Sequence, residues 1–324
     1  MIKEKKASCT YADVLAAREH VYRHLNPTPL HNYAGLSELV GAEVHVKHEN
    51  HHAVGAFKVR GGVNLAAHLA RAGQTAGLYT ASTGNHGQSI AFAGKVSGIP
   101  VRVAMPEGAN PSKVSAIRRL GAEVVTHGRD FDEGREWIKA EADKVGARFI
   151  SPTDPELIAG VGTYTLEIME SLPDVEVIIV PVGAGSGASS VSLVAKTINP
   201  SVQVIAVQAE KAPAIYQSWK ARHVLEGEMH TAAEGLATRV AFENTLTMML
   251  DPKTGIDDFV LVSDEAMEDA VRLLLEHTHN LAELAGAASL AAALQLKPRL
   301  AGKKVVLVLS GGNLAMDKLR RIIA

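Results

Sequence analysis

The stretch 49-ENHHAVGAFKVRGG-62 contains a lysine, Lys58, whose neighbours suggest a chemical role. Lys58 directly follows Phe57 and lies among small residues, with the pair Gly61-Gly62 just beyond it. An amine that is withdrawn from water has a lowered pKa and can act near neutral pH as a nucleophile or base. A lysine that forms a Schiff base needs such surroundings. The same letters also fit a surface lysine at the start of a helix, so the rest of the chain must decide.

The composition is that of a water-soluble globular protein. The 324 residues are enough for one large or two medium domains, and they are 47% hydrophobic and 21% charged. A net charge of −2 gives no sign of a nucleic-acid or membrane-surface partner. The single cysteine, Cys9, excludes a disulfide framework and a multi-cysteine metal site. The N-terminus has no signal-peptide core, and no apolar run reaches the roughly 18 residues of a membrane helix, so we expect a cytoplasmic protein.

A polar loop of small residues, 82-STGNHG-87, lies between a short predicted strand (77–81) and a predicted helix (88–97). Backbone N–H groups and the positive end of the helix face outward from such a loop, which makes it an anion site. Thr83 and Asn85 add side-chain donors, and a carboxylate would suit the site. An ordinary capped turn between strand and helix fits the loop equally well.

A second loop, 183-GAGSG-187, follows the apolar strand predicted at 175–181 and precedes another helix. Glycines let backbone N–H groups approach phosphate oxygens, and the helix dipole adds attraction. The spacing is neither that of a P-loop nor G-x-G-x-x-G, which disfavours a dinucleotide. A small phosphate group is the favoured ligand, with a plain tight turn as the alternative.

Strands and helices alternate along most of the chain with short connections, which is typical of parallel sheets covered by helices. We expect little regular structure in 227–256, and we expect Asp264 to cap a helix over 264–277. The apolar run 304–309 predicts a last buried strand. Ser310 follows it and so lies at the carboxyl end of a strand, where ligands bind in open α/β sheets.

Taken together, the AFKVR, STGNHG, GAGSG and 310-SGGN-313 segments resemble the fold-type II pyridoxal-phosphate enzymes, in the threonine/serine dehydratase and serine racemase branch. The resemblance covers nearly the whole chain, from 27-PTPL-30 to Asn313. It implies an α/β fold of the tryptophan synthase beta type, with two three-layer domains and parallel-rich sheets. The expected large domain comprises residues 1–49 plus 149–324, and the expected small inserted domain comprises 50–148.

The resemblance also assigns roles to residues of this chain. Lys58 looks like the Schiff-base lysine, and Phe57 would pack near the cofactor ring. Asn85 resembles the partner of the ring 3′-oxygen, and Ser310 would face the pyridine nitrogen. The remaining cofactor contacts implied are a phosphate loop of Gly183, Ala184, Gly185, Ser186 and Gly187, with Gly235 beside the ring and Glu283 near its edge. The loop that grips the substrate carboxylate would be Ser82, Thr83, Gly84, Asn85 and His86.

The activity implied is that of an ammonia-lyase, in which a β-hydroxy amino acid such as L-threonine or L-serine yields a 2-oxo acid and ammonia. Lys58 would take the α-proton as general base. A neutral serine at the ring nitrogen makes a weaker electron sink than an aspartate, which favours prompt loss of the β-hydroxyl. Serine racemisation and β-replacement remain alternatives, and a non-catalytic binding protein on the same fold is a remote one. The family is usually homodimeric.

Departures from the family pattern limit these expectations. Thr83 stands where the racemases carry an acid/base serine, and its branched side chain is stiffer, which makes racemisation less favoured. Gln208 and Ala214 align with acidic ligands of a divalent metal in several relatives and supply no carboxylate, so we expect no metal there. The chain ends at Ala324 without a regulatory domain, which suggests a catabolic role. Arg239 is a candidate for holding a second substrate carboxylate.

Overall fold

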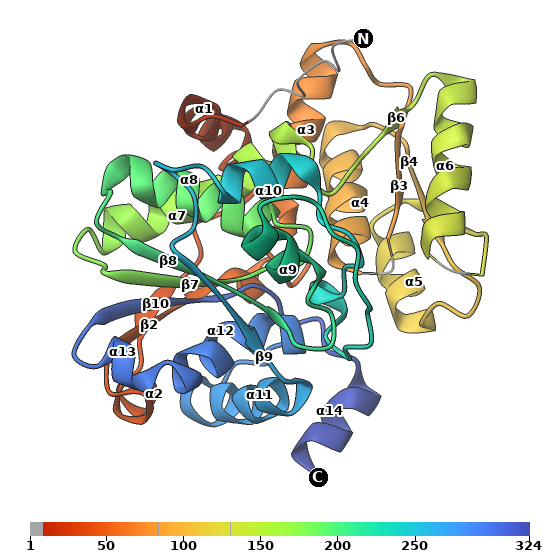
Figure 1. Ribbon diagram of the computed structural model, residues 1–324. Helices are drawn as coiled ribbons and strands as arrows, with labels where there is room; N and C mark the ends of the chain where they lie inside the picture. The colour runs from red at the N-terminus through yellow and green to blue at the C-terminus, as the bar shows by residue number, and fades with distance from the viewer. Residues whose placement is uncertain (1–8, 83, 130) are drawn as a thin grey trace. The chain divides into compact units, whose positions relative to one another are not determined.

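The computed structural model describes residues 9–82, 84–129 and 131–324, which divide into two compact units (Figure 1). The first unit contains residues 9–11, Pro27–Phe57 and Tyr164–Ala324, and the second contains Ala12–Asn26 and Lys58–Thr163. Each unit holds its own sheet. The domain limits expected from the sequence, 1–49 plus 149–324 and 50–148, stay a prediction.

The first unit is built on a six-stranded sheet in the order β1-β2-β10-β7-β8-β9. Its strands are β1 (Leu30–Asn32), β2 (Glu43–His48), β7 (Val177–Pro181), β8 (Gln203–Ala209), β9 (Asp258–Val262) and β10 (Lys304–Leu309). Every neighbouring pair is parallel except β1 with β2. The central strands are nearly continuous runs of valine, isoleucine and leucine because helices cover both faces. The expected α/β fold with parallel-rich sheets is confirmed.

Helices lie on both faces of this sheet; Figure 1 shows α12 on one face and α8 on the other. The helical segments of the unit are η1 (Glu49–His51), α2 (Ala34–Val40), α8 (Ser186–Ile198), α9 (Ala214–Ala221), η2 (Glu234–Leu236), α10 (Glu243–Met249), α11 (Asp264–Thr278), α12 (Leu284–Gln295), α13 (Lys297–Leu300) and α14 (Met316–Ile323). The alanines of α12 let it lie close to the strand ends. A Cβ on Gly286 would stand 2.2 Å from the carbonyl oxygen of Gly311, so only glycine fits there.

The second unit has a parallel four-stranded sheet in the order β5-β4-β3-β6. Its strands are β3 (Leu78–Ala81), β4 (Val101–Met105), β5 (Glu123–Thr126) and β6 (Arg148–Phe149). Its helices are α3 (Lys58–Arg71), α4 (Asn85–Ser97), α5 (Pro111–Arg119) and α6 (Phe131–Val145), with most of α1 (Tyr11–Val21) and the first half of α7 (Pro155–Ser171). Alternate residues of β4 serve two cores: Val103 packs with Ile90 of α4, and Ala104 with Ile138 of α6.

Two local expectations were wrong. Ser263, not Asp264, caps α11, because its Oγ accepts the Ala266 N–H at 3.0 Å. The Asp264 carboxylate instead accepts the N–H of Ala232 at 2.9 Å, a contact between residues far apart in the sequence. The segment 227–256 contains η2 and α10, and both of these contribute to the site described below.

Across the described residues, no helix combines the length and the apolar character needed to cross a membrane.

Candidate active site

The loop 183–187 connects β7 to α8 and forms a cradle for an anion. Gly185 precedes the first turn of α8 with φ of 95°, a left-handed conformation that favours glycine. The first N–H groups of a helix have no intrahelical partner. Within the described part of the chain, the N–H groups of residues 183–188 donate to no backbone carbonyl. They are therefore available to a phosphate, whose charge the helix dipole also favours.

The cradle is closed on one side by Gly235 of η2, which approaches Gly183 backbone to backbone. A Cβ on Gly183 would stand 2.1 Å from the Gly235 carbonyl oxygen, and a Cβ on Gly235 would stand 2.7 Å from Ala285 Cβ. The Glu283 carboxylate also lies beside Gly235, because its Oε1 would be 3.9 Å from a Cβ on that glycine. The structure thus brings the predicted residues Gly183, Gly235 and Glu283 together, and the two glycines are required by the close approach.

Thr245 of α10 contacts the cradle through its side chain. The sequence did not predict this role. Its Oγ1 donates to the Ala184 carbonyl at 2.8 Å. A Cβ on Gly185 would stand 2.8 Å from the same Oγ1. Sixty-one residues separate Thr245 from Ala184, and no local pattern marks the pairing. Gly187 is less restricted, because its Cβ would meet Tyr164 and Phe57 only at 3.6 and 3.7 Å.

Ser310 follows β10 as expected and is 7% exposed. Its Oγ lies 3.5 Å from the Ala285 carbonyl, and its own carbonyl accepts the Phe57 N–H at 3.1 Å. The N–H of Glu283 bonds to the next carbonyl, that of Gly311, at 3.1 Å. The hydroxyl side chain is neutral, so the strand end presents no formal charge. Phe57, Glu283 and Ser310 therefore belong to one hydrogen-bonded cluster of the first unit.

Lys58 is the first residue of α3 in the second unit. Its carbonyl accepts the hydroxyl of Ser89 at 2.6 Å, which ties the start of α3 to α4. The two helices pack so closely here that a Cβ on Gly62 would stand 2.5 Å from Ser89 Oγ. This contact explains Gly62, whereas a Cβ on Gly61 would stand 2.6 Å from the carbonyl oxygen of Leu157. The first turn of α3 is held in place from α4, and Lys58 with it.

The 82–87 loop is shaped by its own serine. Ser82 Oγ accepts the N–H of Gly84 at 3.2 Å and of Gly87 at 2.9 Å, and α4 then begins at Asn85. The Ser82 oxygen therefore accepts two N–H groups of the loop, and its hydroxyl proton remains for donation to another group. Thr83, expected among the substrate contacts, lies outside the described residues.

His86 is buried beside this loop, and its Nε2 lies 3.0 Å from Thr80 Oγ1. Burial, together with the positive charge of Lys58, lowers the pKa of His86 to about 3. The imidazole is therefore neutral throughout the physiological range, and it would not offer a positive charge to a substrate carboxylate. The influence of Lys58 also shows that the lysine and the loop lie near one another within the second unit.

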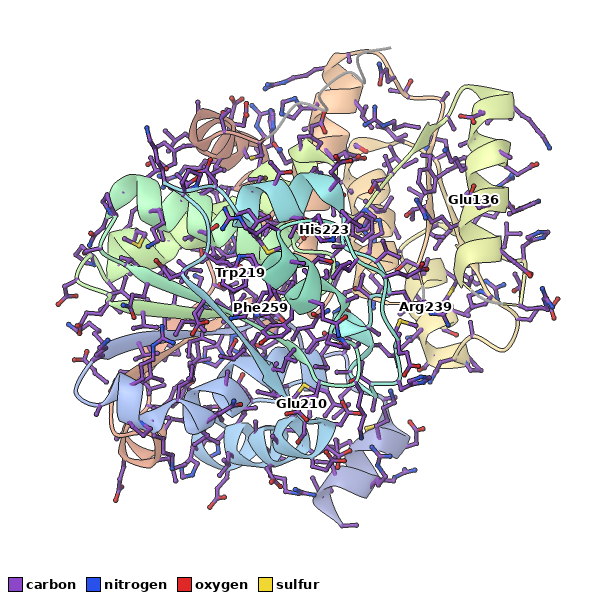
Figure 2. The ribbon with its side chains drawn as sticks, viewed as in Figure 1. Glu136, Glu210, Trp219, His223, Arg239 and Phe259 are labelled. Atoms are coloured by element: carbon purple, nitrogen blue, oxygen red, sulfur yellow. The ribbon has the colours of Figure 1, made fainter. Side chains whose placement is uncertain are left out.

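Gln208 and Ala214, where no metal is expected, lie at the end of β8 and the start of α9. Gln208 Oε1 accepts the Tyr216 N–H at 3.0 Å. Glu210 (Figure 2) is the nearest carboxylate in sequence and is exposed. In the described ranges, no group of three histidine, cysteine or acidic side chains is arranged to hold a metal ion. The absence of a metal stays a prediction.

Two sets of expected residues are thus assembled separately. The first unit joins Phe57, the loop 183–187, Gly235, Glu283 and Ser310; the second joins Lys58 with Ser82, Asn85 and His86.

Arg239 (Figure 2) is exposed in the first unit, and its carbonyl accepts the N–H of Gly227 at 2.8 Å. The unpaired N–H groups of the cradle fit the phosphate of pyridoxal phosphate, and the neutral serine fits an unprotonated ring nitrogen.

Comparison with known proteins identifies the family of the chain. The family model described as pyridoxal-phosphate dependent enzyme matches residues 21–311. The chain belongs to this family, and its cofactor is pyridoxal 5′-phosphate. L-threonine ammonia-lyase of Thermotoga maritima is 41% identical over 317 residues, which is 97% of this chain and 78% of that protein.

Two solved structures are also similar. The processed form of threonine deaminase isoform 2 from Solanum lycopersicum superposes with a TM-score of 0.90 at 31% identity, covering 96% of this chain and 90% of that one. Maize serine racemase gives a TM-score of 0.91 at 29% identity, covering 98% and 97%. The family resemblance inferred from the sequence is confirmed, and the chain is an enzyme of this family.

Proposed function

We propose that the protein is an ammonia-lyase that converts a β-hydroxy amino acid such as L-threonine or L-serine to a 2-oxo acid and ammonia. The observation that carries the proposal is the joint presence of Lys58, the cradle and the neutral Ser310 in a chain 41% identical to an L-threonine ammonia-lyase. The site residues themselves are assigned by this proposal.

Bound pyridoxal phosphate supplies an electron sink for the substrate α-carbon, and the chain's residues supply position and proton transfer. Lys58 Nζ would hold the cofactor and would take the α-proton from the substrate as general base. The N–H groups of 183–187 and the dipole of α8 bind the cofactor phosphate. Ser310 would face the ring nitrogen, and its hydroxyl would supply a hydrogen bond there without a formal charge.

The loop 82–87 binds the substrate carboxylate through its remaining N–H groups and the Asn85 side chain. Ser82 fixes the loop's turn, and His86 contributes no positive charge because its pKa is held near 3. The α-proton that Lys58 removes and the departing β-hydroxyl together make up one water, and the enamine product hydrolyses after release to the 2-oxo acid and ammonia. Carboxylate recognition by dipoles rather than by an imidazolium makes substrate binding insensitive to pH in the neutral range.

Serine racemisation is the second candidate, and the similarity to maize serine racemase favours it. Both reactions start with removal of the α-proton, and they differ in whether a group on the opposite face returns a proton before the hydroxyl leaves. The two are separated by examining the configuration of serine that remains after partial turnover.

The test is incubation of the purified protein with L-threonine or L-serine, with 2-oxobutanoate, pyruvate and ammonia measured. We expect a 2-oxo acid and ammonia in equal amounts. Lys58→Ala should lose turnover by at least roughly 10²- to 10⁴-fold, and borohydride should no longer attach the cofactor to the chain. Lys95→Ala, a lysine of the neighbouring helix α4, is the matched control and should behave as wild type.

Three outcomes would contradict the proposal. Dehydration by Lys58→Ala at the wild-type rate would remove the lysine from its role. Formation of D-serine without pyruvate would identify a racemase. Cofactor attachment without any product from β-hydroxy amino acids would point to β-replacement or to a non-catalytic binding protein.

We further propose a cytoplasmic homodimer. The dimer is supported by the usual state of the family, and the location by the finding that no helix among the described residues could cross a membrane. Light scattering coupled to size-exclusion chromatography tests the dimer, because it measures a mass that is compared with 34.3 kDa for one chain. A mass of one chain at working concentration would contradict it.

A further inference from the structure

Thr80, in the middle of β3, is 1% exposed and has one hydroxyl proton to donate. Its Oγ1 donates to the carbonyl oxygen of Ile150 at 3.1 Å. The same Oγ1 lies 3.0 Å from Nε2 of His86. Since the hydroxyl proton is used on the carbonyl, Thr80 can only accept from the ring, and the shared proton must sit on Nε2.

With Nε2 protonated, the state of Nδ1 follows from the charge of the ring. The ring is neutral, as its low pKa shows, and a neutral imidazole has one protonated nitrogen. Nδ1 is then a bare acceptor.

We propose that Thr80 is a positioning residue of the site: its hydroxyl holds His86 as the Nε2–H tautomer and so keeps Nδ1 as an uncharged acceptor. Thr80, His86, Ile150 and Lys58 all belong to the second unit. The neutral ring adds no second positive charge near Lys58, whose own charge acts on the His86 ring. The catalytic consequence rests on the proposed ammonia-lyase activity, whereas the tautomer does not.

Thr80→Val tests the proposal, because it removes the hydroxyl and keeps the branched shape. Thr80→Ser restores the hydroxyl without the methyl group. Thr126→Val is the matched control, since Thr126 is an exposed threonine on β5 of the same sheet. The tautomer is read from the ¹⁵N shifts of histidine-labelled holoenzyme, with His86 assigned by difference from His86→Gln.

For the wild type we expect one Nε2–H signal for His86 that does not titrate between about pH 5 and 9. In Thr80→Val the Nδ1–H form should appear, and kcat/KM for L-threonine should fall roughly three- to tenfold with a changed pH profile. Thr80→Ser should restore the Nε2–H signal and most of kcat/KM. Thr126→Val should match the wild type in both measurements.

An Nδ1–H signal for wild-type His86 would overturn the proposal, as would a wild-type tautomer and kcat/KM in Thr80→Val. If the wild type shows no lyase activity, the proposed function fails, and the ¹⁵N spectra still decide the tautomer. If the tautomer shifts in Thr80→Val and kcat/KM does not, the positioning role is refuted while the hydrogen-bond assignment stands.

Discussion

The backbone N–H of Phe57 donates a 3.1 Å hydrogen bond to the carbonyl oxygen of Ser310, although the two residues lie 253 positions apart. The segment before Phe57 is held against the residues after Ser310 by further bonds. Gly312 donates to the Gly55 carbonyl at 2.9 Å, and Asn313 Nδ2 donates to the Val54 carbonyl at 2.8 Å. The peptide that leads to Lys58 is therefore fixed to the strand end that carries the neutral serine.

Asn313→Ala should loosen this attachment. It removes the donor to Val54 and leaves a carbonyl unpaired, for which we expect a loss of about 1–3 kcal/mol in the free energy of unfolding. Affinity for pyridoxal phosphate should fall as well, as measured by equilibrium dialysis. Asn313→Asp keeps the size of the side chain and removes the NH₂ donor, so it should show a similar loss. An Asp variant with wild-type stability would mean that this hydrogen bond is not the source of the effect.

Two glycines of the phosphate cradle give a matched pair. Gly183→Ala places a Cβ 2.1 Å from the Gly235 carbonyl, so one of the two backbones must move. Gly187→Ala places its Cβ at 3.6 Å from Tyr164, which is ordinary contact. We expect Gly183→Ala to weaken cofactor binding at least tenfold, about 1.4 kcal/mol, and Gly187→Ala to weaken it much less. Equal losses in both variants would show that glycine is needed for a reason other than close approach.

Features that short stretches of sequence encode could be predicted, whereas features that depend on contacts between distant residues could not. The alternation of strands and helices, the 183–187 loop and the place of Ser310 are encoded in short stretches, and the structure contains them. The N-cap of α11 is Ser263 and not the predicted Asp264, because the Asp264 carboxylate accepts the N–H of Ala232, 32 positions away.

Helix α10 and the role of Thr245 were missed for the same reason. The segment 227–256 has weak helical periodicity, and Thr245 acquires a role only through the Ala184 carbonyl, 61 residues away. No sequence motif marks the Thr80 hydroxyl either, since its partners His86 and Ile150 come from the first turn of α4 and from the residue after β6. Residues expected to contact the ligand can be matched to sequence motifs. Residues that position them through hydrogen bonds, such as Thr245 and Thr80, are identified only from the three-dimensional structure.

Lys47 and Glu167 form a buried ion pair in the first unit, with 2.5 Å between Nζ and Oε2. The Lys47 ammonium also donates to the Thr28 carbonyl at 2.7 Å, and the Thr28 N–H donates to the same carboxylate. Lys47→Met removes one charge and leaves the other buried, so we expect a loss of about 3–5 kcal/mol in the free energy of unfolding. Adding Glu167→Gln should recover part of it, as measured by urea denaturation. Additive losses in the double variant would show that the two side chains are not coupled.

Ser82→Ala should act on substrate binding rather than on the cofactor. The variant leaves the N–H groups of Gly84 and Gly87 without their shared acceptor, so the loop loses its fixed turn. We expect KM for L-threonine to rise roughly tenfold, about 1.4 kcal/mol, with cofactor content unchanged. Ser82→Thr keeps the oxygen and should retain most of the affinity. A fall in cofactor content with an unaltered KM would assign the loop to the cofactor instead.

His48 makes the stability of the first unit depend on pH. Its ring is buried, with His51 stacked at 4.8 Å, His31 at 5.8 Å and the Tyr33 hydroxyl 2.9 Å from Nε2. Burial first, and then the charges of His51, His31 and Lys47, lower the pKa of His48 from 6.5 to about 4. The unfolded chain therefore binds a proton between about pH 6.5 and 4 that the folded protein does not.

Stability must accordingly fall as the pH drops through this window, and His48 alone should account for about 2 kcal/mol between pH 7 and 5. His48→Gln keeps an acceptor for Tyr33 and cannot be protonated. Urea denaturation at pH 7 and pH 5 should show a smaller pH dependence in this variant than in the wild type. His24→Gln, at an exposed position, should keep the full dependence. An unchanged dependence in His48→Gln would mean that His48 is protonated in the folded protein as readily as in the unfolded chain.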